Sequence, residues 1–411
     1  MKHYKEGQTS EQMDGRRALE DITILDLTRV ICGPMGTMIL GDFGANIIKV
    51  ENTTTGDDTR LWAPYIDNSS AFFAYINRNK RGITLNLKSD EGRRIFLELV
   101  KHVDVVVENF RPGVMKRLGI DYEACKAVNE KIIFASASGF GSYGPYSYKP
   151  GYDPMAQAMG GIQSLTGPVE GSPYKAGAAI ADASTGINVA LGIMIALHYR
   201  EMTGKGQYFE VSLVDSIISL ISTDTFEYLY NGKKTRRVGN KNATLSPYGN
   251  YKGSDKEFVM CCGNQKLFEI LCREGMKQPE LIDDPRFKTL ALRSENYDAL
   301  KEIVDAWTSQ RTADENVELL EKLGIPTAPI LDIEQILYSP HMCDAREMFI
   351  ETEHPTLGKV VMTGSPYKLS ETPAHFYRRA PYMGEHNEEI LTSMLHMSKD
   401  EIDKLHEDGV I

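Results

Sequence analysis

The sequence lacks an excess of positive charge, an apolar leader at its start and any pair of cysteines at metal-binding spacing. Its formal net charge of −11 does not suit the phosphate backbone of nucleic acids, which is bound by clustered cations. The one dense basic run, residues 233–237, is explained more simply as a solvated linker than as a nucleic-acid patch. We therefore expect no nucleic-acid partner.

Segments typical of membrane or secreted proteins are also missing. No stretch approaches the roughly 20 apolar residues of a membrane span, and residues 1–6 lack the apolar core of a signal peptide. The six cysteines include no C-x-x-C pair and no histidine partner at metal spacing, which predicts free thiols in a reducing compartment. We expect a cytoplasmic protein that binds neither a membrane nor a metal.

The sequence does contain alternating apolar strands and helices. Hydrophobic residues make up 42% of the 411 positions, enough for a full core. Strand-like segments separated by helical ones cover residues 22–27, 46–50, 103–107, 131–136 and 208–212. Strands that are apolar nearly throughout are typical of a parallel sheet buried on both faces, so we predict an α/β fold.

Shifts in composition predict the domain boundaries. Residues 1–20 are polar and aperiodic, which indicates a flexible N-terminal tail. A large domain is expected over residues 21–230, a linker rich in Gly and Lys over 231–250, and a small domain over 251–335. Residues 345–411 are expected to return to the large domain.

Asp182 is the strongest candidate for chemistry in the chain. It precedes the apolar segment 187–199, which predicts a buried helix whose N-terminus opens on a pocket. Unpaired N–H groups and the helix dipole favour negative charge there, so we expect a low pKa and an ionised carboxylate. Asp is also an ordinary N-cap residue, so a capping role is the alternative to a nucleophilic one.

Residues 139–144 spell the G-x-G-x-x-G of dinucleotide-binding folds. That fingerprint needs a helix N-terminus to receive a pyrophosphate, whereas Pro145, Lys149 and Pro150 predict an extended loop. A nicotinamide or flavin enzyme is therefore disfavoured.

Seven motifs along the chain occur in an order that is found in a known family. They are ILDLTRV at 24–30, VENFRPG at 107–113, SGFGSYGPY at 138–146, KPGYDP at 149–154, AIADASTG at 179–186, TGKGQ at 203–207 and PYMGEH at 381–386. Together they resemble the class III CoA-transferases, the family that includes formyl-CoA and carnitine CoA-transferases and the α-methylacyl-CoA racemases. The resemblance covers nearly the whole chain.

The resemblance implies a Rossmann-like large domain with a parallel sheet built from both chain ends, a smaller α+β domain and an interlocked homodimer. It implies an acyl-CoA and a carboxylic acid as substrates, with no permanently bound cofactor. Coenzyme A would pass from donor to acceptor through an aspartyl-CoA thioester on Asp182 and mixed anhydride intermediates. Backbone N–H groups at the helix start or in a glycine-rich segment would stabilise the oxyanions.

The same resemblance assigns CoA binding to Val30, Lys88, Asn109, Phe110 and Arg117. Asn109 and Phe110 directly follow an apolar strand, at the edge of the sheet where open α/β folds bind ligands. The planar guanidinium of Arg117 can grip a CoA phosphate with two hydrogen bonds.

Four further positions distinguish members of this family. Tyr152 stands where the racemases have the histidine that partners the aspartate, which favours a transferase over the alternative, an acyl-CoA racemase or epimerase acting at the α-carbon. Ile31 replaces a glutamine of the formyl-CoA enzyme and indicates a larger or less polar acyl group. We expect Tyr152, Ile31 and Asp153 to border the acyl site. Asn52 replaces an arginine, which leaves the adenine end of CoA unassigned.

Overall fold

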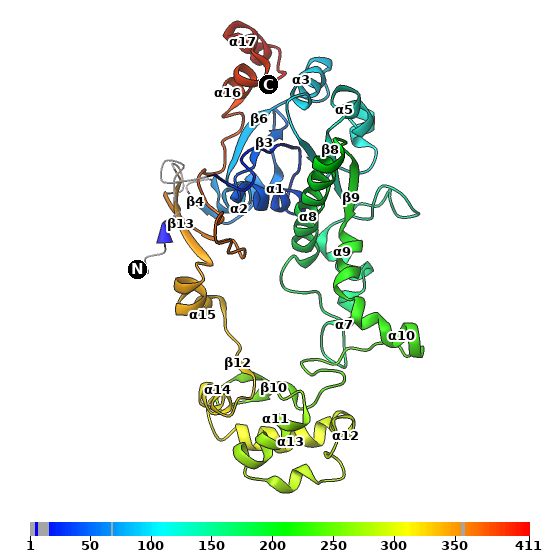
Figure 1. The fold of residues 1–411 in the computed structure, drawn as a ribbon, viewed down its shortest axis with the longest axis vertical. Coiled ribbons are helices and arrows are strands. Elements are labelled where there is room, and N and C mark those ends of the chain that lie inside the picture. The colour runs from blue at the N-terminus through cyan, green and yellow to red at the C-terminus, as the bar shows by residue number, and fades with distance from the viewer. Residues whose placement is uncertain (1–4, 7–15, 67–68, 355–357) are drawn as a thin grey trace. The chain divides into compact units, whose positions relative to one another are not determined.

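The computed structural model describes residues 5–6, 16–66, 69–354 and 358–411 (Figure 1). The chain divides into two compact units. The first contains Met1–Ile162, Ala176–Phe226 and Tyr338–Ile411, and the second contains Gln163–Lys175 and Glu227–Leu337. Most of the tail predicted over residues 1–20 lies outside the described residues, although Lys5–Glu6 forms a short strand, β1.

The first unit is built on a six-stranded parallel sheet with the strand order β6-β3-β2-β7-β8-β9. Its strands are β2 (Thr23–Asp26), β3 (Asn46–Glu51), β6 (Lys80–Thr84), β7 (Val105–Glu108), β8 (Ile133–Ser138) and β9 (Tyr208–Ser212). The sheet confirms the predicted α/β class. Strand β6 is an addition to the predicted set: its first residue, Lys80, is charged and yet buried, because its ammonium pairs with Asp26 at 2.8 Å.

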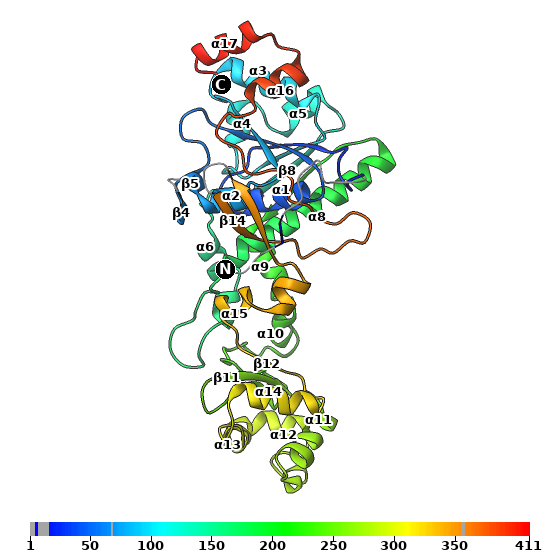
Figure 2. The ribbon, with the colours of Figure 1, turned by 90° about the vertical axis from the view of Figure 1, so that its left-hand side faces the viewer.

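Helices cover both faces of this sheet (Figures 1 and 2). One face carries α1 (Cys32–Asp42) and α8 (Ile180–Thr203), and the other carries α3 (Asp90–Val100), α5 (Tyr122–Val128), α16 (Asn387–Leu395) and α17 (Lys399–Glu407). Neighbouring strand residues alternate between the two layers, as the pleat requires. Ile24 packs in the layer of α8, whereas Leu25 packs in the layer of α3.

Helix α8 differs from its prediction. It begins at Ile180, ahead of the apolar segment 187–199 from which it was predicted, so Asp182 lies in its first turn and Ala179 is the N-cap residue. The helix is not buried all round, because one stripe is exposed: Ile187, Leu191, Ile195 and Met202.

The length and apolar composition of α8 also bear on the expectation that no segment could span a membrane. Among the described residues, α8 alone is long and apolar enough to cross a membrane. The expectation that no stretch approaches the composition of a membrane span was therefore wrong. A core helix of a soluble protein meets the same criterion, and Val189 and Ile193 of α8 are buried against the sheet.

Close packing of α1 on α8 depends on two glycines. A Cβ built on Gly36 would lie 2.9 Å from the Gly186 carbonyl oxygen, and a Cβ built on Gly186 would lie 2.8 Å from the Cys32 carbonyl oxygen. Real Cβ atoms do not approach backbone so closely, so any larger residue would push the helices apart. This contact brings the start of α1 beside the first turns of α8.

The second unit has its own apolar core and a three-stranded antiparallel sheet of β10 (Tyr248–Lys252), β11 (Glu257–Cys261) and β12 (Thr327–Pro329). Its helices are α11 (Gln265–Ile270), α12 (Leu290–Glu295), α13 (Tyr297–Thr308), α14 (Ala313–Lys322) and α15 (Ile333–Leu337). In the first unit β13 (Phe349–His354) pairs with β14 (Gly358–Thr363) and with β1, and β4 (Tyr65–Ile66) pairs with β5 (Ser69–Ser70). The other helices are α2 (Ala71–Ile76), α4 (Val114–Leu118), α6 (Asp153–Met159), α7 (Ile162–Leu165), α9 (Leu213–Leu220) and α10 (Phe226–Asn231).

Candidate active site

The strand order places a switch point between β2 and β7. The sheet continues from β2 through β3 and β6 on one side, and from β7 through β8 and β9 on the other. Open parallel sheets bind ligands where the order reverses in this way, beyond the carboxyl ends of the strands. Asn109 joins the two loops there: its Oδ1 accepts from the Arg29 N–H at 2.8 Å, and its Nδ2 donates to the Arg29 carbonyl at 2.7 Å.

A cavity of about 250 Å³, which we call the smaller cavity, opens beside this junction. Six of the predicted site residues lie on its wall, namely Val30, Ile31, Asn109, Phe110, Tyr152 and Asp182. Residues 149–151 of the loop after β8 form part of the wall, and the loop closes on itself where Gly139 and Gly151 touch. A Cβ on Gly139 would lie 2.4 Å from the Cα of Gly151, so this closure requires glycine.

A second cavity of about 580 Å³, the larger cavity, lies at the ends of β3 and β6. Lys88 and Asn52 both line it, and Arg29 and Phe110 line both cavities. Asn52 uses its side chain within its own loop, since Oδ1 accepts from the N–H groups of Thr54 at 3.0 Å and Thr55 at 2.7 Å. Lys88 thus remains as the cation on this wall that the sequence singled out.

Two predicted site residues, Arg117 and Asp153, line neither cavity. Arg117 is exposed on α4, between Val114 and Leu118, which do line the larger cavity. Asp153 is only 8% exposed, so it lies behind the wall that its neighbour Tyr152 forms.

Asp153 instead caps the start of α8. Its Oδ1 accepts from the N–H of Ala181 at 2.7 Å and from the N–H of Asp182 at 3.4 Å, while Gln157 donates to its Oδ2 at 2.6 Å. The flanking N–H groups of Ile180 and Ala183 bond to backbone carbonyls. The helix start therefore offers no free N–H group to an oxyanion. This contradicts the expectation that N–H groups at the helix start would stabilise the oxyanions.

The expected low pKa of Asp182 was also wrong. Burial raises the pKa of Asp182 to about 7, and the negative charge of Asp153 adds to the shift. Two physical changes reverse the expectation: the carboxyl is largely removed from water, and the helix N–H groups that favour an anion are already bonded to another carboxylate. Since Ala179 is the N-cap residue, the alternative capping role of Asp182 is excluded.

Sequence reasoning missed two residues near the site, Cys32 at the start of α1 and Glu108 at the end of β7. Cys32 lies close to Asp182: burial, together with the charge of Asp182, raises the pKa of the Cys32 thiol to about 12. Behind Asn109, Glu108 accepts from the Phe110 N–H at 2.7 Å and from the Ser136 hydroxyl, and burial raises its pKa to about 7. Their position at the first or last residue of an element was the signal in the sequence that could have pointed to them.

The smaller cavity also carries three cations that were not singled out, Arg29, Arg111 and Lys149. Arg29 pairs with Asp58 at 2.6 Å, whereas Lys149 rests over the ring of Tyr146 at 4.1 Å from the ring centre. No cluster of metal-ligating side chains occurs within the described parts of the chain.

The sheet, its switch point and the two cavities define an α/β protein with a candidate ligand site at the carboxyl edge of the sheet. A model of the family described as CoA-transferase family III matches residues 19–387. Acetyl-CoA:oxalate CoA-transferase of Acetobacter aceti is 41% identical over 85% of this chain and 89% of that protein. Succinyl-CoA:glutarate CoA-transferase of Mus musculus is 36% identical over 98% and 93%, respectively.

A solved structure shows the same fold. The crystal structure of a CAIB/BAIF family protein from Brucella suis superposes with a TM-score of 0.82 and 35% sequence identity, covering 92% of this chain and 100% of that one. The chain belongs to CoA-transferase family III and is an enzyme of that class.

Proposed function

We propose that this enzyme moves coenzyme A from an acyl-CoA donor to a carboxylic acid through a covalent intermediate on Asp182. The observation that carries this proposal is the smaller cavity at the switch point, because it brings the Asp182 carboxyl to one wall with Asn109, Phe110, Val30 and Tyr152. A carboxylate on a cavity wall is a nucleophile that needs neither metal nor prosthetic group.

The two cavities suggest how the substrate lies. The larger cavity suits the nucleotide end, where Lys88 would meet phosphate, and the smaller one suits the thioester, beside Asp182. Phe110 and Arg29 belong to both walls, so a single extended ligand can pass across them. Binding energy from the nucleotide and the pantetheine arm would then orient the thioester carbonyl against the carboxylate.

The exchange proceeds in four steps on Asp182, and in each step the bond that forms replaces one that breaks. Its carboxylate attacks the donor carbonyl, releasing CoA thiolate and leaving a mixed anhydride. The thiolate attacks the aspartyl carbonyl, which frees the donor acid and forms the aspartyl-CoA thioester. The acceptor carboxylate attacks this thioester, the thiolate leaves again, and its attack on the acceptor carbonyl of the second anhydride regenerates Asp182.

The cavity wall further supports a dicarboxylic acid as one of the two acids. The relatives above act on oxalate and glutarate, by their names. Here Lys149 lies on the wall with Asp182 and has no carboxylate partner among the described residues, so it can hold the second carboxylate. Ile31 on the same wall favours a methylene chain between the two charges.

A matched panel of acids tests this proposal. Succinyl-CoA and acetyl-CoA serve as donors, and glutarate is compared with pentanoate, which has the same length but one carboxylate. We expect transfer to glutarate at least about tenfold faster, and a preference that falls in Lys149→Ala, since a charge-assisted contact is worth about 1.5–3 kcal/mol. Equal rates for the two acids would exclude a dicarboxylate site.

A further inference from the structure

Val30 has an unusual backbone conformation for its side chain. Its φ of +70° lies in the left-handed region, which a β-branched residue adopts only where surrounding contacts hold it. Val30 lies on the wall of the smaller cavity between Arg29 and Ile31. The shape of this wall therefore depends on whatever holds residues 28–30.

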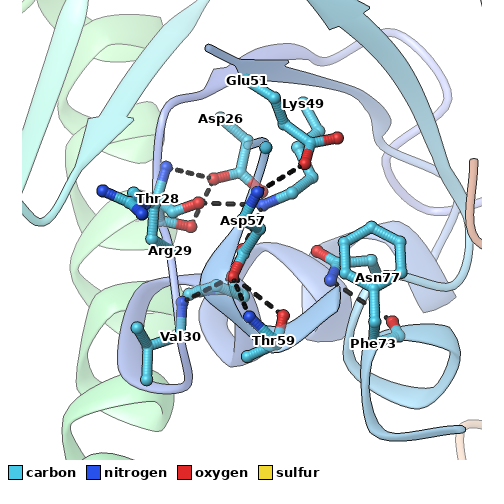
Figure 3. A network of polar contacts seen from close by, with 12 residues as sticks. Asp26, Thr28, Arg29, Val30, Lys49, Glu51, Asp57, Thr59, Phe73 and Asn77 are labelled. Atoms are coloured by element: carbon cyan, nitrogen blue, oxygen red, sulfur yellow. Dashed lines mark hydrogen bonds and ion pairs between the residues drawn. The ribbon is translucent and has the colours of Figure 1, made fainter. Parts of the chain in front are cut away.

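A buried ion pair supplies two of the contacts that hold this segment (Figure 3). The Lys49 ammonium donates to the Thr28 carbonyl at 2.9 Å and to Oδ2 of Asp57 at 2.8 Å, and both charged side chains are completely buried. The other oxygen of Asp57, Oδ1, accepts from the Val30 N–H at 3.3 Å. The pair thus binds the segment at the residue before Arg29 and at the residue after it.

Other side chains fix the pair and the segment in turn (Figure 3). The same Oδ1 of Asp57 accepts from the Thr59 N–H at 3.0 Å and from its hydroxyl at 2.8 Å, and Glu51 accepts from the Asp57 N–H at 2.8 Å. Asp26 accepts from the Thr28 N–H at 2.9 Å. Burial raises the pKa of Asp57, but the charge of Lys49 and the hydrogen bonds from Lys49 and Thr59 together outweigh burial and lower this pKa to about 2, so the carboxylate stays charged.

We propose that Lys49 and Asp57 are positioning residues that hold Val30 in its left-handed conformation, and with it the cavity wall that faces the reacting thioester. The inference rests on the proposed function for its catalytic part. Two buried charges are weak evidence for a stabilising role, because apolar side chains of similar size often serve stability equally well. Apolar side chains could not, however, accept from the Val30 N–H or donate to the Thr28 carbonyl.

Two charge-free pair variants test this role. Lys49→Met with Asp57→Asn keeps an oxygen for the Val30 N–H, whereas Lys49→Met with Asp57→Leu removes it. We expect kcat for CoA exchange to be about tenfold lower in the leucine pair than in the asparagine pair, and KM for acyl-CoA is measured separately because Asp57 also lines the larger cavity. The buried pair Arg78 and Asp42, whose side chains are 3% and 6% exposed, lies on neither cavity and gives the matched control, Arg78→Met with Asp42→Leu.

Val30→Gly separates positioning from general structure, because glycine adopts a positive φ without strain. Added to both pair variants, it should bring their kcat values within about threefold of each other. Equal kcat values before Val30→Gly is added, or a gap that survives it, would overturn the inference. If the leucine pair does not fold, Lys49→Met with Asp57→Ala takes its place, because alanine also removes the oxygen that accepts from the Val30 N–H. A loss of kcat in that variant that Val30→Gly reverses supports positioning, and a loss that Val30→Gly leaves unchanged contradicts it.

A readout that does not need turnover keeps this inference distinct from the proposed mechanism. Hydrogen exchange of the Val30 amide should be faster in the leucine pair than in the asparagine pair, and equal rates would contradict the inference. Asp182→Asn is run in the same CoA-exchange assay. If that variant keeps its turnover, the proposed function fails, while the exchange of the Val30 amide still decides whether Lys49 and Asp57 hold the segment.

Discussion

The carboxyl group of Asp182 is subject to two opposing effects. A nucleophile must be ionised, yet this side chain is partly buried on the cavity wall and lies near the charge of Asp153. The hydrogen bonds that could have favoured the anion go from the first turn of α8 to Asp153 instead. With a pKa of about 7, the group is ionised in roughly half of the molecules at neutral pH.

This raised pKa makes a prediction about stability. Between the unfolded pKa of about 3.9 and the folded pKa of about 7, the folded state binds a proton that the unfolded state does not, so stability falls as the pH rises through that window. Asp182→Asn removes this loss. We expect the free energy of unfolding of the variant, relative to wild type, to increase by about 2 kcal/mol between pH 5 and pH 8 in urea titrations. A pH-independent difference would contradict the burial argument.

The two cations that the resemblance assigned to CoA, Lys88 and Arg117, can each be tested by substitution. Lys88 lies on the wall of the larger cavity, and Arg117 lies one helix position away from it. Each is expected to weaken CoA binding by about 1.5–3 kcal/mol when changed to alanine, the value of a charge-assisted contact. Calorimetry measures the dissociation constants, with exposed Lys101→Ala as control. A residue whose change leaves the constant unaltered does not contact CoA.

At the residue scale, motifs predicted the members of the site better than their electrostatics. Asp182 was singled out from its local sequence, and Asn109 and Phe110 from the family resemblance; the three line the smaller cavity together. The pKa of Asp182 could not be found in this way, because it depends on burial and on Asp153, which a loop and α6 bring to the start of α8. The Lys49 and Asp57 pair was invisible for the same reason.

At the scale of elements, the packing of α1 on α8 sets where Asp182 lies. Gly186→Ala should destabilise the first unit by about 1–3 kcal/mol, because its Cβ would meet the Cys32 carbonyl oxygen at 2.8 Å. Gly177→Ala is the control, since open space surrounds a Cβ there. Urea unfolding compares the two, and equal midpoints for both variants would show that the close approach is not required.

Elements with regular apolar patterns were predicted, and those with charged residues were not. The strands β2, β3, β7, β8 and β9 followed from nearly continuous apolar runs. β6 escaped because a buried Lys80 interrupts its pattern, and only the distant Asp26 explains that lysine. The start of α8 was placed too late, since the cap comes from Asp153 rather than from the helix's own sequence.

At the scale of the molecule, the exposed stripe on α8 supports a homodimer. Ile187, Leu191 and Ile195 are 43%, 56% and 60% exposed, which is costly unless a second copy covers them. We predict twice the mass of one chain in light scattering at micromolar concentration, and a shift toward monomer in Leu191→Glu with Ile195→Glu. A monomeric wild-type protein would contradict the prediction. The α/β class could be predicted from alternation alone, whereas interlocking stays a prediction from resemblance, because pairing of copies leaves no periodic pattern.

The central claim is that Asp182 becomes covalently bound during turnover. The most direct measurement is mass spectrometry of the enzyme after incubation with succinyl-CoA and trapping with hydroxylamine or borohydride. We predict one modified peptide, containing Asp182, in wild type and none in Asp182→Asn, because a neutral amide cannot form the anhydride. The account is contradicted if the trapped label falls on another residue, or if Asp182→Asn, with deamidation excluded, is labelled and turns over like wild type.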